Sequence, residues 1–381
     1  MKILIATPIY PPEIGGPATY IKELCGHLSG SNEITVIAYT NSADAFPNTR
    51  LVPVGKGRPL PIRLAIFFLK LLREVKKTKP DVMYVQNAMA AGLPVALVHL
   101  LTKVPFVLKF VGDEAWERAT GRKRTKKRLE EFMADPDGGI KIRLMMMIQG
   151  FVLRRASVVT TPSAYLSEAL IRTYDVKKEN AVVNYNAAER PESIPFPTTR
   201  KPHQIATTAR LVAWKGIGGI IRALAIIKKS FPDARLVIAG DGPLLENLQK
   251  IAEDFEVLDS VTFLGNVSRA ETWQLRKNSE VYVLNSTYEG LPHTALTSFA
   301  AEIPMVATNI PGTNEAVYHE KTGLLVEAGD DIELAKAVER LFTNKKLAEQ
   351  LAKDATLLLK EKFSWEAHTK TLLNIFKSVL A

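Results

Sequence analysis

LVIAGDGPLLENL, residues 236–248, decides the fold class. A short run rich in Val and Ile leads into a Gly-Asp-Gly-Pro turn, and a longer segment with helical periodicity follows the turn. Short apolar runs bounded by glycine and proline are typical of buried strands, whereas apolar residues three and four positions apart indicate a helix. The stretch therefore predicts one strand, one tight turn and one helix.

The same alternation recurs along most of the chain and predicts parallel sheets with crossover helices. In the first half we expect strands at 2–7, 34–39, 50–54, 81–86, 105–111, 157–161 and 181–184. In the second half the strand-like runs are IATTARL, ARLVIAG, SVTFLG, VYVLNS, PMVATN and GLLVE. The stretch 186–204 interrupts the pattern with four prolines and is predicted to be a linker. The fold class is thus α/β, with two doubly wound domains and a ligand site in a cleft at the carboxyl ends of their strands.

Composition is that of a folded enzyme-sized protein. The 381 residues are 46% hydrophobic and 24% charged, and Cys25 is the only cysteine, which excludes an internal disulfide. The apolar run 64–72 contains Lys70 and is far shorter than the roughly 20 residues of a membrane span. We expect neither a transmembrane segment nor a signal peptide, and no nucleic-acid partner, because no reading module is present.

Two glycine-containing segments could bind an anion. Gly15 and Gly16 follow the first strand and precede Pro17, so a helix N-terminus there could approach a ligand, although a plain tight turn explains the same residues. Arg210 follows a strand of the second half, and Lys215 precedes a glycine-led helix. A guanidinium and an ammonium so placed suit a diphosphate, the alternative being two solvated surface cations.

Further candidates follow the next strands. Gly240 belongs to the Gly-Asp-Gly-Pro turn, and Gly265 and Asn266 end the next strand, where backbone groups could contact a base or form an ordinary loop. Glu289 follows the run VYVLN and precedes a helix expected near His293. Its carboxylate could accept hydrogen bonds from sugar hydroxyls, although a surface turn would also explain a charge at this position.

Taken together, these motifs resemble the family 4 retaining glycosyltransferases, which have the two-Rossmann-domain architecture called GT-B. The resemblance rests on the Gly15-Gly16 loop and on ARLVAWKG, AGDGP, YEGLP, PMVATNIPGTNEAV and KTGLLVEAGD, which occur in the family's order. It implies a nucleotide-sugar donor as co-substrate and no other cofactor. It also implies that Arg210 and Lys215 neutralise the donor diphosphate, that Glu289 binds the donor sugar, and that backbone groups at Gly16, Gly290 and Leu291 lie against the donor.

By the same resemblance, residues 1–190 form an acceptor-binding domain and 191–363 a nucleotide-sugar-binding domain. The C-terminal segment 364–381 is expected to be a helix that packs back onto the first domain. Its predicted apolar positions are Trp365, Leu372, Ile375, Phe376 and Leu380.

The sequence departs from the family pattern at two places. A second glutamate that usually holds the donor ribose is replaced by Thr297, whose hydroxyl makes weaker bonds than a carboxylate. The loop KFVGDEAWERA lacks a histidine found in many members, so Asp113 and Glu117 become candidates for contacting acceptor or donor sugar, with a structural role as the equal alternative. No metal site is expected, because the histidines are scattered and Arg and Lys can stabilise the leaving diphosphate.

The basic cluster RKRTKKR, residues 122–128, precedes a methionine-rich helical region. Residues 1–195 contain 28 Lys and Arg against 18 Asp and Glu, so this half carries the whole net charge of +10. We expect the cluster to contact an anionic membrane surface, the alternative being a solvated helix face.

The expected function is that of a metal-independent, retaining hexosyltransferase that moves a sugar to a glycan or lipid-linked acceptor in envelope polysaccharide or glycolipid synthesis. The expected location is the cytoplasm, at the inner face of the cell membrane. A sugar-nucleotide 2-epimerase of the same architecture and a non-catalytic nucleotide-sugar binder are the alternatives.

Overall fold

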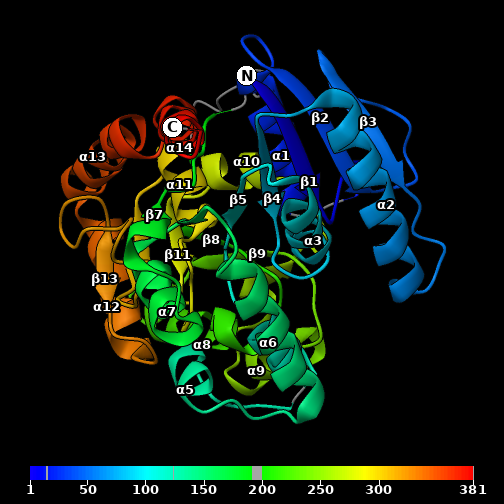
Figure 1. Ribbon diagram of the computed structural model, residues 1–381. Coiled ribbons are helices and arrows are strands. Elements are labelled where there is room, and N and C mark those ends of the chain that lie inside the picture. Colours follow the sequence, from blue (N-terminus) through cyan, green and yellow to red (C-terminus); the bar gives the residue numbers. More distant parts are fainter. Residues whose placement is uncertain (14–15, 123, 191–199, 381) are drawn as a thin grey trace. The chain divides into compact units, whose positions relative to one another are not determined.

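The computed structural model describes residues 1–13, 16–122, 124–190 and 200–380 (Figure 1). Its contacts divide the chain into an N-terminal unit, Met1–Asn184 with His368–Ala381, and a C-terminal unit, Tyr185–Ala367. The sequence predicts these two boundaries at 190/191 and 363/364. Part of the predicted linker, 191–199, lies outside the described residues.

The N-terminal unit contains a seven-stranded sheet in the order β3-β2-β1-β4-β5-β6-β7, and its recorded strand pairs are all parallel. All seven strands were predicted, with ends within two residues. They are β1 (Lys2–Thr7), β2 (Glu33–Tyr39), β3 (Thr49–Val54), β4 (Val82–Gln86), β5 (Phe106–Lys109), β6 (Val158–Thr161) and β7 (Ala181–Val183).

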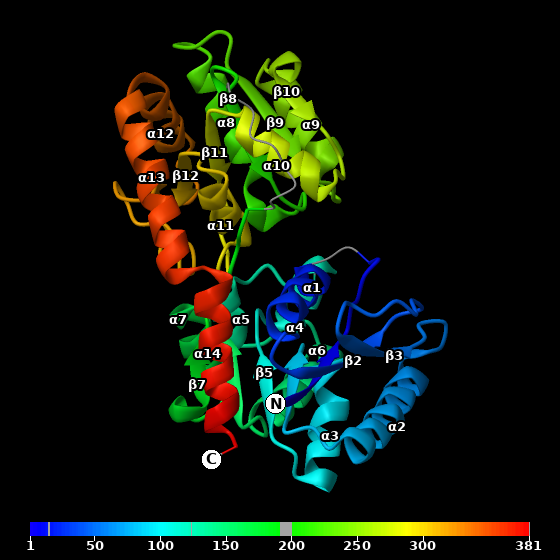
Figure 2. The ribbon, with the colours of Figure 1, turned by 90° about the horizontal axis from the view of Figure 1, so that it is seen from above.

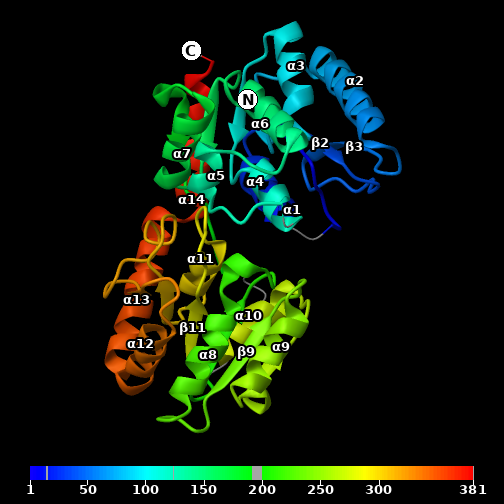
Figure 3. The same ribbon diagram turned by 90° about the horizontal axis from the view of Figure 1, so that it is seen from below.

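Helices connect these strands as crossovers. They are α1 (Gly16–Leu28), α2 (Leu60–Thr78), α3 (Gly92–Thr102), α4 (Glu114–Gly121), α5 (Leu129–Ala134), α6 (Ile140–Leu153) and α7 (Ala164–Tyr174). The connections that carry α2, α3 and α6 all progress in one direction across the sheet, from β3 to β6. Because such crossovers are right-handed, these three helices cover the same face, and Figure 3 shows α2 and α3 side by side.

The last helix, α14 (Trp365–Ser378), contributes to the N-terminal unit (Figure 2, red). The Tyr20 hydroxyl lies 2.7 Å from His368 Nε2 and 2.8 Å from the Tyr84 hydroxyl, which joins α14 to α1 and β4. The ring of Phe376 packs edge-on against Tyr84. The prediction that Leu380 is an apolar position of this helix is wrong. Leu380 follows the end of α14 and is exposed.

The C-terminal unit contains a six-stranded parallel sheet in the order β10-β9-β8-β11-β12-β13. The six runs noted in the sequence each form one of its strands. They are β8 (Gln204–Thr208), β9 (Arg235–Ala239), β10 (Val261–Phe263), β11 (Val281–Leu284), β12 (Met305–Thr308) and β13 (Leu324–Val326). The helices are α8 (Ile217–Ile227), α9 (Leu245–Asp254), α10 (Arg269–Asn278), α11 (His293–Ala300), α12 (Asp331–Thr343) and α13 (Lys345–Lys362).

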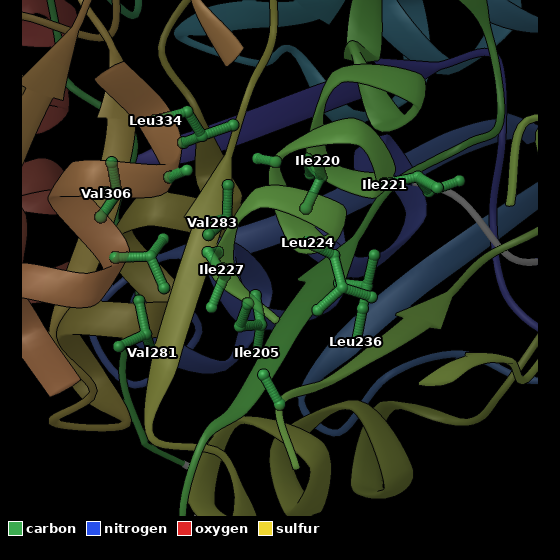
Figure 4. Close-up of a cluster of buried hydrophobic side chains, with 14 of the residues drawn as sticks. Ile205, Ile220, Ile221, Leu224, Ile227, Leu236, Val281, Val283, Val306 and Leu334 are labelled. Carbon is green, nitrogen blue, oxygen red and sulfur yellow. The ribbon is translucent and has the colours of Figure 1, made fainter. Parts of the chain in front are cut away.

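Two apolar cores cover the two faces of this sheet. Val281 and Val283 of β11 pack with Leu224 of α8 in one core (Figure 4), whereas Tyr282 and Leu284 belong to the other. Successive side chains of a strand point to opposite faces, so a strand that is apolar throughout must be covered on both sides. This explains why the predicted strands are continuous apolar runs.

Lys109 is an exception in the N-terminal core. Its side chain is buried at the end of β5, with Nζ 3.8 Å from the centre of the Tyr20 ring. Burial lowers the pKa of the Lys109 ammonium to about 7, because the buried environment disfavours the charged form.

This shift predicts a pH dependence of stability. Between the folded pKa of about 7 and an unfolded pKa of about 10.4, the unfolded chain holds a proton that the folded chain has released. The free energy of unfolding should therefore rise with pH in this window, by at most about 1.4 kcal/mol per pH unit. Below the window the cost of burying the charge is constant.

Urea unfolding of wild type and Lys109→Met across that window tests the prediction. The stability of the wild type relative to the variant should improve as pH rises. A difference that does not change with pH would show that Lys109 keeps its proton in the folded protein.

Candidate functional site

The strand order of the C-terminal unit reverses between β8 and β11. From β8 the chain proceeds to β9 and β10 on one side, and from β11 to β12 and β13 on the other. The loops that follow β8 and β11 diverge there, and ligands of open α/β sheets bind at this point. Lys215 follows β8, in the short helix η2 (Ala213–Lys215), and Glu289 follows β11.

These two predicted residues meet. Lys215 Nζ lies 2.6 Å from Glu289 Oε1, and the side chains are 21% and 10% exposed. Ser286 donates a second hydrogen bond to the same oxygen at 2.7 Å. Among the described residues no group donates to Oε2 of Glu289. The carboxylate is therefore held by one oxygen, and the other oxygen is left for further donors.

Two strands fix the position of the carboxylate. Ser286 is fully buried just past the end of β11, and its carbonyl oxygen accepts a 2.5 Å hydrogen bond from the Thr308 hydroxyl at the end of β12. The sequence pattern does not predict a role for Ser286 or Thr308. The only available signal was the short hydroxyl residue three positions before Glu289.

The segment after β8 is clamped to the segment after β11. Gly216 has φ 62°, and a Cβ atom there would lie 1.9 Å from the carbonyl oxygen of Asn285. The Asn285 side chain donates to the carbonyl of Gly216 at 2.9 Å, and the Thr287 amide donates to the carbonyl of Trp214 at 2.8 Å. Only glycine fits this contact, which brings Lys215 toward Glu289.

The loops after β8, β9 and β10 are also joined by backbone hydrogen bonds. Gly240 donates to the carbonyl of Gly265 at 2.8 Å, and Leu211 donates to the carbonyl of Asp241 at 2.9 Å. A Cβ atom on Gly240 would lie 1.9 Å from the carbonyl oxygen of Ala209. The close approach that Gly240 permits is therefore to the protein's own backbone, whereas a Cβ atom on Gly265 would meet open space. Asn266, beside Gly265, is exposed.

Arg210 is exposed and, in the parts of the chain that the structure describes, forms no ion pair. Lys215, by contrast, is paired with Glu289. Its guanidinium is thus available to an anion without the loss of an existing partner, whereas the Lys215 ammonium must leave or share its contact with Glu289.

Gly290 and Leu291 lie between Glu289 and α11. Gly312 has φ 81°, and a Cβ atom there would lie 2.3 Å from the carbonyl oxygen of Glu289, so the loop after β12 packs directly on this turn. Leu291 is buried. Thr297 is on α11 and donates to the carbonyl oxygens of its own helix, at 3.1 Å to His293 and 3.0 Å to Thr294. Because this hydroxyl donates within its own helix, only its oxygen is left to accept a hydrogen bond from a ligand.

The predicted residues of the N-terminal unit differ in environment. Gly16 begins α1 with open space around it, and Gly15 lies outside the described residues. Asp113 is fully buried, caps α4 by accepting from the Trp116 amide at 2.8 Å, and also accepts from Gln149 and the Tyr174 hydroxyl. Burial raises the pKa of the Asp113 carboxyl. These contacts favour the structural alternative for Asp113, whereas Glu117 is exposed on the same helix.

The basic cluster 122–128 is partly neutralised. Lys127 lies 2.6 Å from the Asp135 carboxylate, and Glu130 and Glu131 follow the cluster after Leu129. Lys123 lies outside the described residues. Over the described ranges we find neither a cluster of three or more metal-ligand side chains nor a helix that is long and apolar enough to cross a membrane.

Sequence comparison identifies the family. The glycosyl transferase 4-like domain model matches residues 15–187, and the glycosyl transferases group 1 model matches residues 190–357. An uncharacterized glycosyltransferase of Methanocaldococcus jannaschii is 26% identical over 400 residues, which cover 99% of this chain and 98% of that protein. The GDP-mannose-dependent alpha-(1-6)-phosphatidylinositol monomannoside mannosyltransferase of Mycobacterium tuberculosis is 25% identical over 380 residues, with 90% of each chain covered.

A solved structure shares the fold. Anabaena HepE, determined in complex with UDP-glucose, has a TM-score of 0.75 and 17% sequence identity, and the match covers 99% of this chain and 100% of that chain. Because the two domain models match in consecutive order over most of the sequence, this chain belongs to the group 1 glycosyltransferases and is a glycosyltransferase with the two-domain α/β fold of GT-B enzymes.

Proposed function

We propose that this glycosyltransferase is retaining and metal-independent, and that it transfers a hexose from a nucleotide sugar to a glycan or lipid-linked acceptor in envelope polysaccharide or glycolipid synthesis. The observation that carries the proposal is the contact between Lys215 and Glu289 at the point where the strand order reverses. Arg210, five positions before Lys215, forms no ion pair with the residues that the structure describes. A cation and a carboxylate at one position suit a donor whose diphosphate adjoins a hydroxylated sugar.

When the donor binds, its diphosphate and its sugar would each contact one partner of the ion pair between Lys215 and Glu289. The diphosphate attracts the ammonium of Lys215 and the guanidinium of Arg210, which bind anionic oxygens with charge-assisted hydrogen bonds. Sugar hydroxyls then donate to Glu289, whose Oε2 is open and whose Oε1 keeps the bond from Ser286. Gly240, Gly265, Asn266, Gly290 and Leu291 are proposed to line the rest of the donor site.

The proposed reaction proceeds by front-side attack. The bond between the anomeric carbon and the diphosphate oxygen breaks, and Arg210 and Lys215 stabilise the charge that develops on the leaving diphosphate. The acceptor hydroxyl attacks the same face of the sugar and transfers its proton to an oxygen of that leaving group. The protein supplies position and electrostatic stabilisation.

The relatives suggest which donors to test first. One is named for its dependence on GDP-mannose, and HepE was solved with UDP-glucose. We propose a location at the inner face of the cell membrane, with cluster 122–128 contributing basic contacts. Transfer to an acceptor distinguishes the proposal from the epimerase alternative, which needs no acceptor, and from a binder that turns nothing over.

The first test concerns the two cations. Arg210→Ala and Lys215→Ala should each reduce kcat by about 10²-fold or more, the scale for loss of a donor to developing charge. Arg210 is exposed, so its loss should leave the melting temperature unchanged, whereas loss of Lys215 deprives the buried Glu289 of its cation and should also lower stability.

Arg235→Ala is the matched control, because Arg235 is also exposed but begins β9, at the opposite edge of the sheet. A chelator should not change the wild-type rate. Normal rates in both site variants, or inactivation by the chelator, would contradict the assignment.

The second test concerns the carboxylate and the residue that positions it. Glu289→Ala should reduce kcat by about 10²- to 10³-fold, and Ser286→Ala by about tenfold, because one of two groups that orient Oε1 is lost. Thr297→Glu should lower the donor KM by up to about tenfold, since a carboxylate accepts stronger hydrogen bonds from the ribose than a hydroxyl does.

Steady-state kinetics with a matched donor, on variants shown to be folded by circular dichroism, measure these effects. Ser286→Thr, which keeps a hydroxyl, should recover part of the lost kcat. If Glu289→Ala retains the wild-type kcat, the proposed role of this carboxylate is wrong.

The third test separates the roles of Asp113 and Glu117. Asp113→Ala removes a helix cap and leaves the buried Tyr174 hydroxyl without its acceptor, while the Gln149 amide keeps only its hydrogen bond to that hydroxyl, so it should cost about 2–4 kcal/mol of stability. Glu117→Ala should change stability by no more than about 0.5 kcal/mol. Thermal unfolding and kinetics of both variants decide: a stable Asp113→Ala protein with greatly reduced kcat would assign Asp113 to the chemistry.

A further inference from the structure

Three helices on one face of the N-terminal sheet carry exposed apolar side chains. α2 packs against α3, and α3 packs against α6, so the three form a continuous layer (Figures 1 and 3). We call the solvent-exposed side of this layer the outer face. Its large exposed apolar residues are Leu60, Ile62 and Leu69 on α2, Leu97, Leu100 and Leu101 on α3, and Ile140, Leu144 and Met147 on α6.

The spacing of these residues makes a stripe on two of the helices. Leu97, Leu100 and Leu101 are at positions i, i+3 and i+4 of α3, and Ile140, Leu144 and Met147 are at i, i+4 and i+7 of α6. The largest exposed fractions are 81% for Ile140, 69% for Met147, 65% for Leu101 and 62% for Leu69. Single exposed apolar residues are ordinary, but such residues grouped on adjoining helices mark an interaction surface.

The exposed charged side chains of the three helices are all basic. α3 and α6 contain no acidic residue, and the one acid of α2, Glu74, is buried in an ion pair with Arg50. The exposed charged side chains of the three helices are Lys70, Arg73, Lys76, Lys77, Lys141 and Arg143. Cluster 122–128 has Asp135, Glu130 and Glu131 close to it, and of these acids Asp135 also interacts electrostatically with Arg143 of α6.

We propose that the outer face of α2, α3 and α6 rests on an anionic lipid surface. Basic side chains beside apolar ones, on three helices that carry no exposed acid, match a bilayer whose headgroups are negative and whose acyl region is apolar. Long basic side chains can reach headgroups while the apolar side chains enter the boundary of the acyl region. The inference refines the proposed membrane partner and does not depend on the proposed transfer reaction.

Vesicle co-sedimentation tests the proposal directly, with mixed phosphatidylcholine–phosphatidylglycerol vesicles and with pure phosphatidylcholine vesicles. Wild-type protein should bind the mixed vesicles, and salt should weaken the binding. The triple variant Leu69→Gln, Leu101→Gln, Met147→Gln and the charge variant Lys70→Gln, Arg73→Gln, Lys141→Gln, Arg143→Gln should each bind at least about tenfold more weakly.

The matched control is Phe255→Gln, Ile332→Gln, Leu357→Gln, which removes three exposed apolar side chains (45%, 58% and 55%) from the C-terminal unit. This control should bind as the wild type does. Thermal unfolding establishes that all variants are folded, and transfer to a soluble acceptor should continue in each, which separates failure of membrane binding from failure of the proposed reaction.

Four results would overturn the proposal. One is wild-type protein that ignores the mixed vesicles at low salt, and another is equal loss of binding in the face variants and the control. The third is a wild-type dimer, seen by analytical ultracentrifugation, that the triple variant dissociates, because the outer face would then contact a second copy. Loss of binding on neutralising Arg122, Arg124, Lys126 and Arg128, with none in the face variants, would assign the contact to cluster 122–128.

Discussion

Parallel strands impose the constraint on which the rest of this structure depends, because the carboxyl ends of all strands in a sheet lie at one edge. In the C-terminal unit this brings together loops that follow β8, β9, β10, β11 and β12. Backbone hydrogen bonds and glycine contacts then join neighbouring loops, so that the side chains they carry have fixed positions. The contact between Lys215 and Glu289 is the chemical result of this arrangement.

The strands were predictable from sequence because a parallel strand is covered on both faces. Val281 to Leu284, for example, is apolar throughout, and alternate residues enter opposite cores. The pairing of Lys215 with Glu289 was not predictable from the residues alone, because 74 positions separate them and only the strand order brings them together. The family resemblance placed both residues at the donor, but it did not indicate that they contact each other without one.

Other features of the site could not be predicted from the sequence, for a different reason. Ser286 and Thr308 act through hydrogen bonds of a buried hydroxyl, and serine and threonine at strand ends are too common to signal such a role. Asp113 followed a predicted strand, as functional carboxylates often do, but its burial depends on Gln149 and Tyr174, which come from later helices. A motif position alone therefore could not distinguish a substrate contact from a helix cap.

The attachment of α14 has a consequence for the order in which the protein folds. The N-terminal unit is completed by His368 and Phe376, which contact Tyr20 and Tyr84, yet these residues follow the whole C-terminal unit in the chain. During synthesis, domains generally fold as they emerge. Here the first unit emerges without its last helix, and the apolar and tyrosine side chains that α14 covers stay uncovered until the ribosome has finished the second unit.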